Sequence, residues 1–406
     1  MIPHLASLNQ CTGCSACSDT CRHNAITMRY NKNGFLTPTI NYDKCIGCKA
    51  CERACPILNI DKLPFNSIKK AQHLAAWSNN DEVCLNSSSG GIFSQIAINL
   101  LRKGNFVVFG SMASKGNTCK HRSIKHIEEL NVIAGTKYIQ SNTEGSYKEV
   151  RKALQEGMKV FYCGTPCQIA GLYAFLGYKN LPSLYTAELI CHGIASNITA
   201  DITTTYIGAN YIESFRDKKE GWCKPPLNRA CQQQVTYKMK DGSLYRDKAR
   251  LFTKAFVSTH RISCTSCLFA QPNRIADLSL GDLWGLYNKY PQRGDLGASL
   301  VLANNNKGLE LLNTGSITTY QHKLEELNCY TLFYPGACKY TQLSNILFLI
   351  KKLPSRTAYN IISLNWRNNP FLLPLCILNY FFNRKHHKKI ISAIKRFQKE
   401  LTHNKN

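Results

Sequence analysis

Hydrophobic and polar positions follow two different periods along the chain between residues 71 and 310. Short apolar runs predict buried strands, and segments with apolar residues three and four apart predict amphipathic helices. Strands are expected at His73–Ser78, Phe106–Gly110, Tyr138–Gln140, Val160–Cys163, Tyr185–Cys191, Ala276–Leu280 and Ala298–Ala303. Helices are expected at Gly90–Lys103, Ile127–Ile133, Thr143–Glu156 and Cys167–Leu176. This alternation predicts an α/β domain with a mostly parallel sheet.

Two regions depart from this pattern. Gln233–Met239 and Ser243–Asp247 flank the dipeptide Asp241-Gly242, a hairpin signal that predicts an antiparallel insert. Beyond about Tyr334 the chain is expected to be helical and basic. The apolar stretch Phe371–Phe382 is shorter than the ~20 residues that cross a bilayer. The apolar helix face that follows either caps the domain or docks on an anionic membrane surface or acidic partner; it is formed by Ile390, Ile391, Ile394, Phe397 and Leu401.

The N-terminal segment is organised around cysteine instead. Two rows share the spacing C-x2-C-x2-C-x3-C, and they consist of Cys11, Cys14, Cys17 and Cys21, and of Cys45, Cys48, Cys51 and Cys55. In two-cluster ferredoxins three cysteines of such a row hold one 4Fe-4S cluster and the fourth holds the other. The rule pairs Cys55 with the first row and Cys21 with the second. The segment therefore resembles an α+β two-cluster ferredoxin domain, which transfers single electrons.

The alternatives for these eight cysteines are a disulfide scaffold or zinc sites. Zinc sites usually separate two C-x2-C pairs by a dozen or more residues, whereas each row here packs four cysteines into eleven residues. Arg22 stands where such a row normally carries proline. We interpret it as a local change that tunes the potential of the adjacent cluster through its charge.

Composition places the chain among folded proteins of a reducing compartment. The 406 residues include 20 cysteines, 44% hydrophobic and 19% charged residues. The first ten residues do not resemble a signal peptide, and iron-ligating thiolates need reducing conditions, so a cytoplasmic location is expected. The net charge of +26 is concentrated toward the end of the chain, because residues 339–406 contribute +12. No nucleic-acid-binding motif accompanies this charge, so no nucleic-acid partner is expected.

A second set of cysteines lies downstream. Cys167 and Cys191 are expected at the ends of neighbouring strands, where open α/β sheets bind ligands, and Cys264 and Cys267 form a C-x2-C pair. Together they predict a third 4Fe-4S site, with Cys163 as a possible substitute ligand. Isolated buried cysteines are often chemically inert, so the spacing alone also allows these residues to be structural cysteines rather than ligands.

Several motifs around these cysteines occur in the order found in one family. They are Ser87-Ser88-Ser89-Gly90-Gly91, Gly135-Thr136-Lys137-Tyr138, Gly164-Thr165-Pro166-Cys167-Gln168, Cys191-His192-Gly193, Phe215-Arg216-Asp217-Lys218, Cys264-Thr265-Ser266-Cys267 and Gly281-Asp282-Leu283-Trp284-Gly285. Residues 71–310 thus resemble the coenzyme F420 hydrogenase/dehydrogenase beta-subunit family. The resemblance implies FAD beside a 4Fe-4S cluster, with electrons exchanged between ferredoxin-type clusters and an organic partner. That partner is the deazaflavin in methanogens; other relatives reduce chlorophyll-type pigments or accompany surface-polysaccharide genes.

The residues themselves agree with FAD but leave alternatives open. Ser87–Gly91 precedes a helix, whose N-terminus can hold a pyrophosphate or can simply be capped by this turn. Lys137 can place positive charge near the flavin or lie on the surface. Gly164 and Thr165 complete the expected cofactor contacts, and His192 is either a proton donor or a buried structural histidine. Gly281–Gly285 is expected to form a turn near the cofactor, with Trp284 equally able to belong to the core.

These observations predict three regions and one function. Residues 1–63 form the ferredoxin domain, 71–335 the flavin and iron–sulfur domain, and 336–406 the basic helical region. The chain is expected to be an iron–sulfur flavoprotein oxidoreductase that takes electrons from reduced ferredoxin or a similar donor to a small-molecule acceptor. The alternative is a non-catalytic electron-transfer subunit that serves a partner enzyme. No catalytic residue can be named, and the acceptor cannot be read from the sequence.

Overall fold

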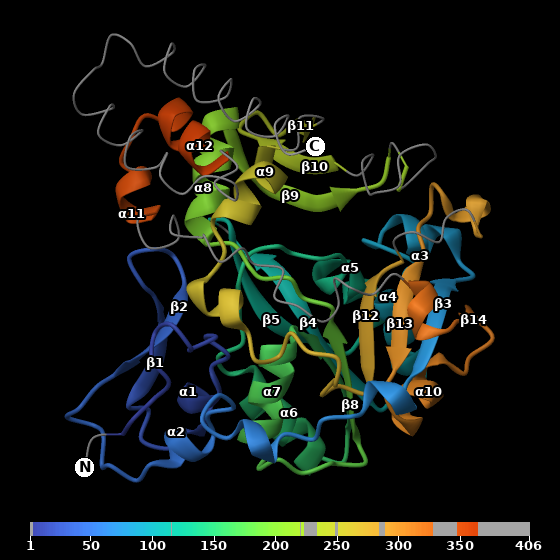
Figure 1. Ribbon diagram of the computed structural model, residues 1–406, viewed down its shortest axis with the longest axis horizontal. Coiled ribbons are helices and arrows are strands. Elements are labelled where there is room, and N and C mark those ends of the chain that lie inside the picture. The colour runs from blue at the N-terminus through green and yellow to red at the C-terminus, as the bar shows by residue number, and fades with distance from the viewer. Residues whose placement is uncertain are drawn as a thin grey trace.

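The computed structural model describes residues 3–114, 116–219, 221–222, 234–247, 251–283, 289–327 and 347–363. Figure 1 shows the ferredoxin-like segment beside one end of a large twisted sheet, with a smaller lobe of helices and strands above both. The predicted apolar stretch at 371–382, the helix face at 390–401 and the residues Trp284 and Gly285 lie outside the described residues. Among the helices that are described, none has the length and apolar character needed to cross a bilayer.

The two cysteine rows adopt the same local conformation. Each row contains a short helix, α1 (Ala16–Thr20) or α2 (Ala50–Arg53), and a hairpin of β1 (Ile26–Tyr30) and β2 (Leu36–Ile40) lies between the rows. Gly13 and Gly47 have φ angles of 70° and 69° at matching positions between ligands. Such angles favour glycine, and a Cβ on Gly13 would in addition lie 2.6 Å from the Leu36 carbonyl oxygen.

The central sheet has nine strands within the described residues, in the order β14-β3-β13-β12-β8-β7-β4-β5-β6. Their bounds are β3 Gln72–Ser78, β4 Phe106–Ser114, β5 Thr118–Ile124, β6 Ser141–Asn142, β7 Lys159–Gly164, β8 Leu184–Leu189, β12 Leu278–Asp282, β13 Ser299–Ala303 and β14 Ile317–Gln321. Strands β12, β8, β7 and β4 run parallel, as do β5 and β6. The other four neighbouring pairs are antiparallel.

The prediction of a mostly parallel sheet was therefore wrong, because the sheet is evenly mixed. The connection from β4 to β5 spans only three residues, and parallel neighbours need a crossover of a dozen or more. The second antiparallel region is formed by β3, β13 and β14 at the opposite edge. Strand β5 was not predicted because its solvent-facing positions are polar. The expected strand at Tyr138–Gln140 shortens to an isolated bridge at Ile139 followed by the two-residue β6.

Helices cover both faces of this sheet. One face packs against α4 (Ile92–Leu101), α5 (Leu130–Ile133) and α10 (Asn306–Leu312), and the other packs against α6 (Ser146–Gln155) and α7 (Pro166–Phe175). Alternate residues of one strand serve the two cores: Phe106 and Val108 join the first, Val107 and Phe109 the second. The helix α3 (Asp81–Leu85) precedes α4, and short 3-10 turns occupy Ile60–Lys62, Ile68–Lys70, Ile127–Glu129, Ile262–Ser266, Pro291–Arg293 and Leu324–Leu327.

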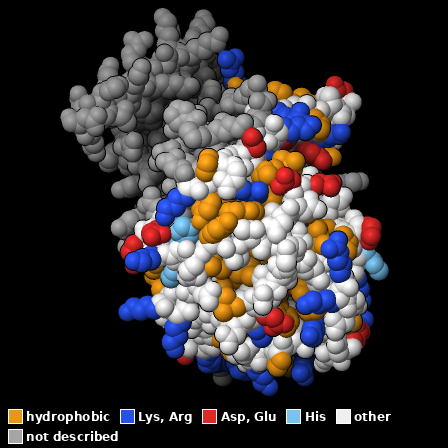
Figure 2. Space-filling model, turned by 90° about the vertical axis from the view of Figure 1, so that its right-hand side faces the viewer, with side chains coloured by type: hydrophobic (Ala, Val, Ile, Leu, Met, Phe, Trp, Pro, Cys, Tyr) orange, Lys and Arg blue, Asp and Glu red, His pale blue; other side chains and the backbone are white. Residues whose placement is uncertain are grey.

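The smaller lobe contains the predicted antiparallel insert. Strands β9 (Ala209–Asp217), β10 (Gln234–Met239) and β11 (Leu244–Asp247) form a three-stranded sheet, and Gly242 adopts a φ of 84° in the predicted hairpin turn. Helices α8 (Asn197–Ile207) and α9 (Leu251–Ser258) pack against this sheet, and α11 (Leu347–Ile350) and α12 (Ser355–Ser363) pack against these two helices. On the face in Figure 2, Lys and Arg side chains are scattered among acidic and apolar ones rather than gathered into one basic surface.

Candidate functional site

The first ferredoxin site is a small cavity lined by four cysteines. They are Cys11, Cys14, Cys17 and Cys55, the set that the ferredoxin spacing rule predicts for one cluster. Burial raises the pKa of the Cys17 thiol, and the neighbouring thiols of Cys14, Cys11 and Cys55 raise it further. Four thiols that line one small cavity favour ligation, because iron supplies the positive charge that holds them as thiolates.

The second ferredoxin site lies nearer the surface. Burial raises the pKa of the Cys51 thiol, and Cys21 adds to the rise, so these two cysteines from different rows are neighbours. Cys48 is exposed, whereas Cys45 and Cys21 are partly buried. This site, which we call the distal site, is therefore the one that an external redox partner can approach; the site of Cys11, Cys14, Cys17 and Cys55 is called the inner site.

The downstream cysteines also come together. Cys167 lies in the first turn of α7, Cys191 lies two residues beyond β8, and Cys264 and Cys267 lie in and after the turn Ile262–Ser266. Burial raises the pKa of the Cys191 thiol to about 12, and Cys167 and Cys267 contribute to the rise. The pKa of Cys264 is likewise raised by burial and then by the other three thiols. Burial raises the pKa of the Cys163 thiol to about 12, and the charge of Lys137 opposes this rise.

The described cysteines are all free thiols. Within the described residues, no three His, Cys, Asp or Glu side chains converge tightly enough to hold one metal ion. Each cysteine of a 4Fe-4S cluster binds a different iron, so its thiolates are spread around the cluster rather than directed at one point. The arrangement of the three cysteine sets is compatible with such clusters.

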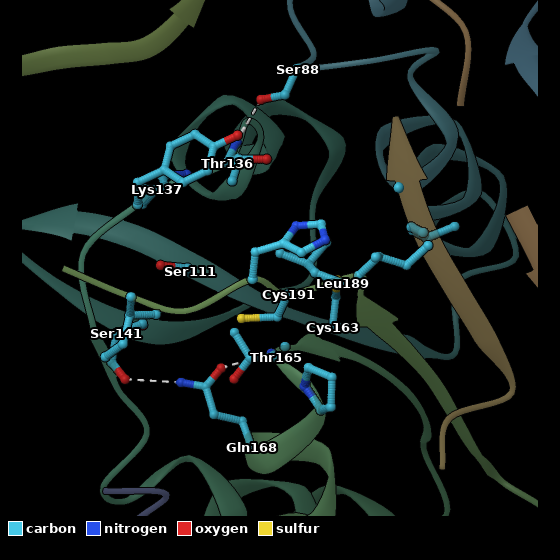
Figure 3. Close-up of a pocket in the computed structure, with 18 of the residues that line it drawn as sticks. Ser88, Ser111, Thr136, Lys137, Ser141, Cys163, Thr165, Gln168, Leu189 and Cys191 are labelled. Atoms are coloured by element: carbon cyan, nitrogen blue, oxygen red, sulfur yellow. Dashed lines mark hydrogen bonds between the residues drawn. The ribbon is translucent and has the colours of Figure 1, made fainter. Parts of the chain in front are cut away.

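All four downstream cysteines line one cavity of about 360 Å³, which lies within the size range of ligand pockets. The carboxyl ends of the parallel strands β7, β8 and β12 reach its wall through Gly164, Leu189 and Asp282. The N-termini of α4 and α7 also face it, through Gly91 and Thr165. Figure 3 shows Ser88, Thr136 and Lys137 on one side of this space and Thr165, Gln168 and Cys191 on another. Helix N-termini and strand ends are the positions at which α/β folds bind anionic ligands.

The serine-rich loop forms one wall of the cavity. Ser88 Oγ accepts a hydrogen bond from the Thr136 backbone N–H at 2.8 Å, which joins this loop to the segment that carries Lys137. Ser87, Ser89 and Gly91 also line the cavity, but Gly90 does not. The Gly90 N–H donates to Ser299 Oγ at 3.0 Å, and a Cβ on Gly90 would lie 2.6 Å from the Ala76 carbonyl oxygen. Gly90 is thus required for packing of the loop against the sheet.

Lys137 lies in the cavity rather than on the surface. Its ammonium donates to the Ala134 carbonyl oxygen at 2.7 Å. Burial lowers the pKa of Lys137 to about 8, and the thiols of Cys119 and Cys163 oppose this shift. Lys137 forms no ion pair with a carboxylate among the residues that the structure describes, so its charge is available to an anionic ligand.

Three further residues of the site were not assigned from the sequence. Arg216 and Asp282 form an ion pair at 2.7 Å on the cavity wall. Lys218 is buried and donates to the backbone carbonyls of Cys84, Ser89 and Leu296, which fixes the serine-rich loop from behind. The sequence signals were two motifs at strand ends: Phe215–Lys218, which contains Arg216 and Lys218, and Gly281–Gly285, which contains Asp282. His192 lines the cavity beside the cysteines, as expected from its position next to Cys191.

Comparison with known proteins agrees with this organisation. Residues 10–58 match the family described as a 4Fe-4S dicluster domain, and residues 157–326 match the family of the C-terminal part of the coenzyme F420 hydrogenase/dehydrogenase beta subunit. The chain therefore joins a dicluster ferredoxin domain to a domain of the F420 hydrogenase/dehydrogenase beta-subunit family, which confirms the predicted resemblance. It is an iron–sulfur electron-transfer protein of that type. The serine-rich loop and Lys137 precede the matched region.

One solved structure that the chain matches is a chain of the F420-reducing [NiFe] hydrogenase complex from Methanosarcina barkeri. The two chains are 18% identical, the match covers 72% of this chain and 91% of the other, and the TM-score is 0.43. No curated protein sequence matches the chain.

Proposed function

We propose that the chain is an iron–sulfur flavoprotein oxidoreductase with a third 4Fe-4S cluster and FAD in the 360 Å³ cavity. The observation that carries the proposal is that one cavity gathers both sets of predicted ligands. Cys167, Cys191, Cys264 and Cys267 would hold the cluster. The FAD contacts would be Ser87, Ser88, Ser89, Gly91, Lys137, Gly164 and Thr165, with Gly90 supporting the loop from behind.

The residues of the cavity suit a group that carries phosphate and takes up negative charge. The N-termini of α4 and α7 carry positive partial charge, and Lys137 adds a cation between Cys119 and Cys163. FAD, when bound, exchanges single electrons with iron–sulfur clusters and exchanges a hydride with an organic molecule. The chain would position that group, supply the compensating charge and exclude water.

The inner ferredoxin site lies directly beside this cavity, which supports a continuous path for electrons. Thr12, next to Cys11, lines both cavities. Cys14 packs against Gly171 of α7, where a Cβ on the glycine would lie 3.0 Å from both Cβ and Sγ of Cys14. Since α7 also carries Cys167, only one turn of helix separates the two sites. Electrons would pass from the exposed distal site through the inner site to the third cluster and FAD.

The partners follow from the two ends of this path. Reduced ferredoxin or a similar protein would deliver electrons near the exposed Cys48. The acceptor would be a small organic molecule that takes two electrons, either a deazaflavin or another substrate such as one of surface-polysaccharide metabolism. Arg216 and Asp282 would contact this molecule or orient the flavin, because both line the cavity.

Anaerobic reconstitution with iron and sulfide tests the assignment. We expect about twelve iron atoms, from three clusters of four, and one FAD per chain. The replacement Cys267→Ser should remove the signal of the third cluster and leave both ferredoxin signals. A wild-type protein with only about eight iron atoms, the content of two clusters, would exclude the third cluster. A protein that binds iron but no flavin would exclude the flavoprotein assignment.

A second candidate is an electron-transfer subunit whose catalytic partner is another chain. Apolar side chains near the distal site favour docking of a protein there: Tyr42 and Ile46, close to Cys45 in the chain, are 61% and 66% exposed. Reduction of a screened set of small-molecule acceptors by the isolated chain, with a soluble electron donor, would support the enzyme. Flavin reduction without turnover of any acceptor would favour the subunit.

A further inference from the structure

Arg261 occupies the space between the inner ferredoxin site and the four downstream cysteines. Its Nε donates to the Cys11 carbonyl oxygen at 2.9 Å, and its Nη1 donates to the Leu36 carbonyl oxygen at 2.8 Å. The same residue accepts a backbone hydrogen bond from the Cys264 N–H at 3.0 Å. Through its side chain and its backbone carbonyl together, this one residue therefore connects the loop that carries the first cysteine row to the turn that carries Cys264 and Cys267.

The charge of Arg261 is buried and has no carboxylate partner among the described residues. The residue is 3% exposed, and its hydrogen-bond acceptors there are neutral: two carbonyl oxygens, Gln140 Oε1 at 3.0 Å and Ser263 Oγ at 3.2 Å. Two other buried arginines near the cavity each pair with a carboxylate, as in Arg216–Asp282 and Arg274–Glu188. Burying a cation without a counter-charge is costly, so a negative group is expected close by.

Iron–sulfur clusters with four thiolates would supply that negative charge on both sides. Arg261 lines the large cavity together with Cys167 and Cys264. Burial raises the pKa of the Cys167 thiol, and the Arg261 charge opposes the rise, which places the guanidinium near this cysteine. On the other side, a Cβ on Gly13 would lie 3.0 Å from Arg261 Nη1, so the loop between Cys11 and Cys14 passes directly over the guanidinium.

We propose that Arg261 is a positioning residue that raises the reduction potentials of both the inner ferredoxin cluster and the third cluster. For the third cluster, this inference rests on the proposed function. A nearby positive charge stabilises the reduced form of a cluster, because reduction adds negative charge, and net charge is one of the properties that set cluster potentials. The hydrogen bonds of Arg261 lead to the inner and downstream cysteines and not to Cys21, Cys45, Cys48 or Cys51 of the distal site. The distal potential should not depend on this residue.

Redox titration of the reconstituted full chain, followed by electron paramagnetic resonance, tests the proposal. Arg261→Gln removes the charge and keeps hydrogen-bonding capacity, and Arg261→Lys keeps the charge. We expect Arg261→Gln to lower the potentials of the inner and third clusters while the distal potential stays as in the wild type. Arg261→Lys should keep the potentials of both clusters close to their wild-type values. The signal of the third cluster is assigned by its loss in Cys267→Ser.

Arg22 provides a matched control at the other end of the path. It is exposed and follows Cys21, so Arg22→Gln should lower the distal potential only, and by less because solvent screens its charge. Unchanged inner and third potentials in Arg261→Gln, or an equal shift of all three clusters, would overturn the proposal. If Arg261→Gln binds less iron than the wild type, the potential of the inner cluster decides, since its ligands lie within residues 11–55.

The iron content of the wild type separates this inference from the proposed function. A wild-type content of about eight atoms, rather than about twelve, would remove the third cluster. The effect of Arg261 on the inner cluster would then still be supported or overturned by the same titration.

Discussion

The buried ion pair of Glu188 and Arg274 fixes the loop after Cys267 to the end of strand β8. Arg274 Nε donates to Glu188 Oε1, which also accepts from Ser279 Oγ at 3.0 Å. The side chains are only 4% exposed for Arg274 and 1% for Glu188. Because β8 leads to Cys191, this pair positions cysteines from two separate segments. Removing one partner would leave a charge in the interior without a counter-charge.

We expect Arg274→Met to destabilise the protein by about 3–5 kcal/mol, the cost of breaking a buried pair from one side. At roughly 2 °C per kcal/mol, the sensitivity of a large domain, the unfolding midpoint should fall by roughly 6–10 °C. The exposed pair Lys152–Glu156, with side chains 77% and 51% exposed, is the control. Lys152→Ala should cost no more than about 0.5 kcal/mol, since solvent screens such pairs.

The double replacement Glu188→Gln with Arg274→Met separates the pair itself from the unpaired charge. Glu188 Oε2 and Arg274 Nη2 lack hydrogen-bond partners among the described residues, so the native pair is incompletely satisfied. We therefore expect the double variant to recover most of the lost stability. Anaerobic calorimetry at one fixed scan rate, with iron content measured on each sample, provides the comparison. The reasoning fails if Arg274→Met melts within about 1 °C of Lys152→Ala, less than the shift expected from 1 kcal/mol.

Two further changes test the packing and the electrostatics of the site. Gly171→Ala should destabilise by about 1–3 kcal/mol despite the better helix propensity of alanine, because the new Cβ meets Cys14 at 3.0 Å. It should also alter the resonance spectrum of the inner cluster, whereas Gly315→Ala, at a position open to solvent, should do neither. Burial lowers the pKa of His260 to about 4, so the unfolded chain binds a proton first as the pH falls below about 6.5. The free energy of unfolding of the wild type should therefore decrease toward pH 4. Relative to the wild type, the free energy of unfolding of His260→Leu should rise by about 2 kcal/mol between pH 6.5 and 5, as measured by chemical denaturation. Parallel pH profiles for the two proteins would contradict this.

Much of the fold followed from local patterns. The strands around Phe106, Val160 and Ala298 were found because a buried strand needs a continuous apolar run, whichever strands become its neighbours. The hairpin at Asp241-Gly242 was found because the turn needs a residue that accepts positive φ. The polar strand β5 and the edge strand β14 were missed, since their pairing depends on strands already placed in the sheet.

The residues of the site likewise fall into those that local spacing predicted and those that only the tertiary structure revealed. The four cysteines of the inner site, which the spacing within residues 11–55 groups together, line one cavity. The supporting residues were not foreseen: Lys218 holds the serine-rich loop from 129 positions away, and Arg261 reaches Cys11 across 250 positions. Lys218 lies in the Phe215–Lys218 motif, but the motif does not reveal its role, because an arginine or lysine between two segments looks like a surface residue until the segments are placed.

The sequence by itself determined the two cysteine rows, the main strands and helices, and the family to which residues 157–326 belong. These depend on spacing and periodicity over a few residues. Only the tertiary structure decided that the sheet is evenly mixed, that Cys14 packs against the helix that carries Cys167, and that Arg261 lies between the two sites. The physical reason is that strand direction, close approach and burial of charge depend on contacts between segments far apart in the chain, which no short-range pattern encodes.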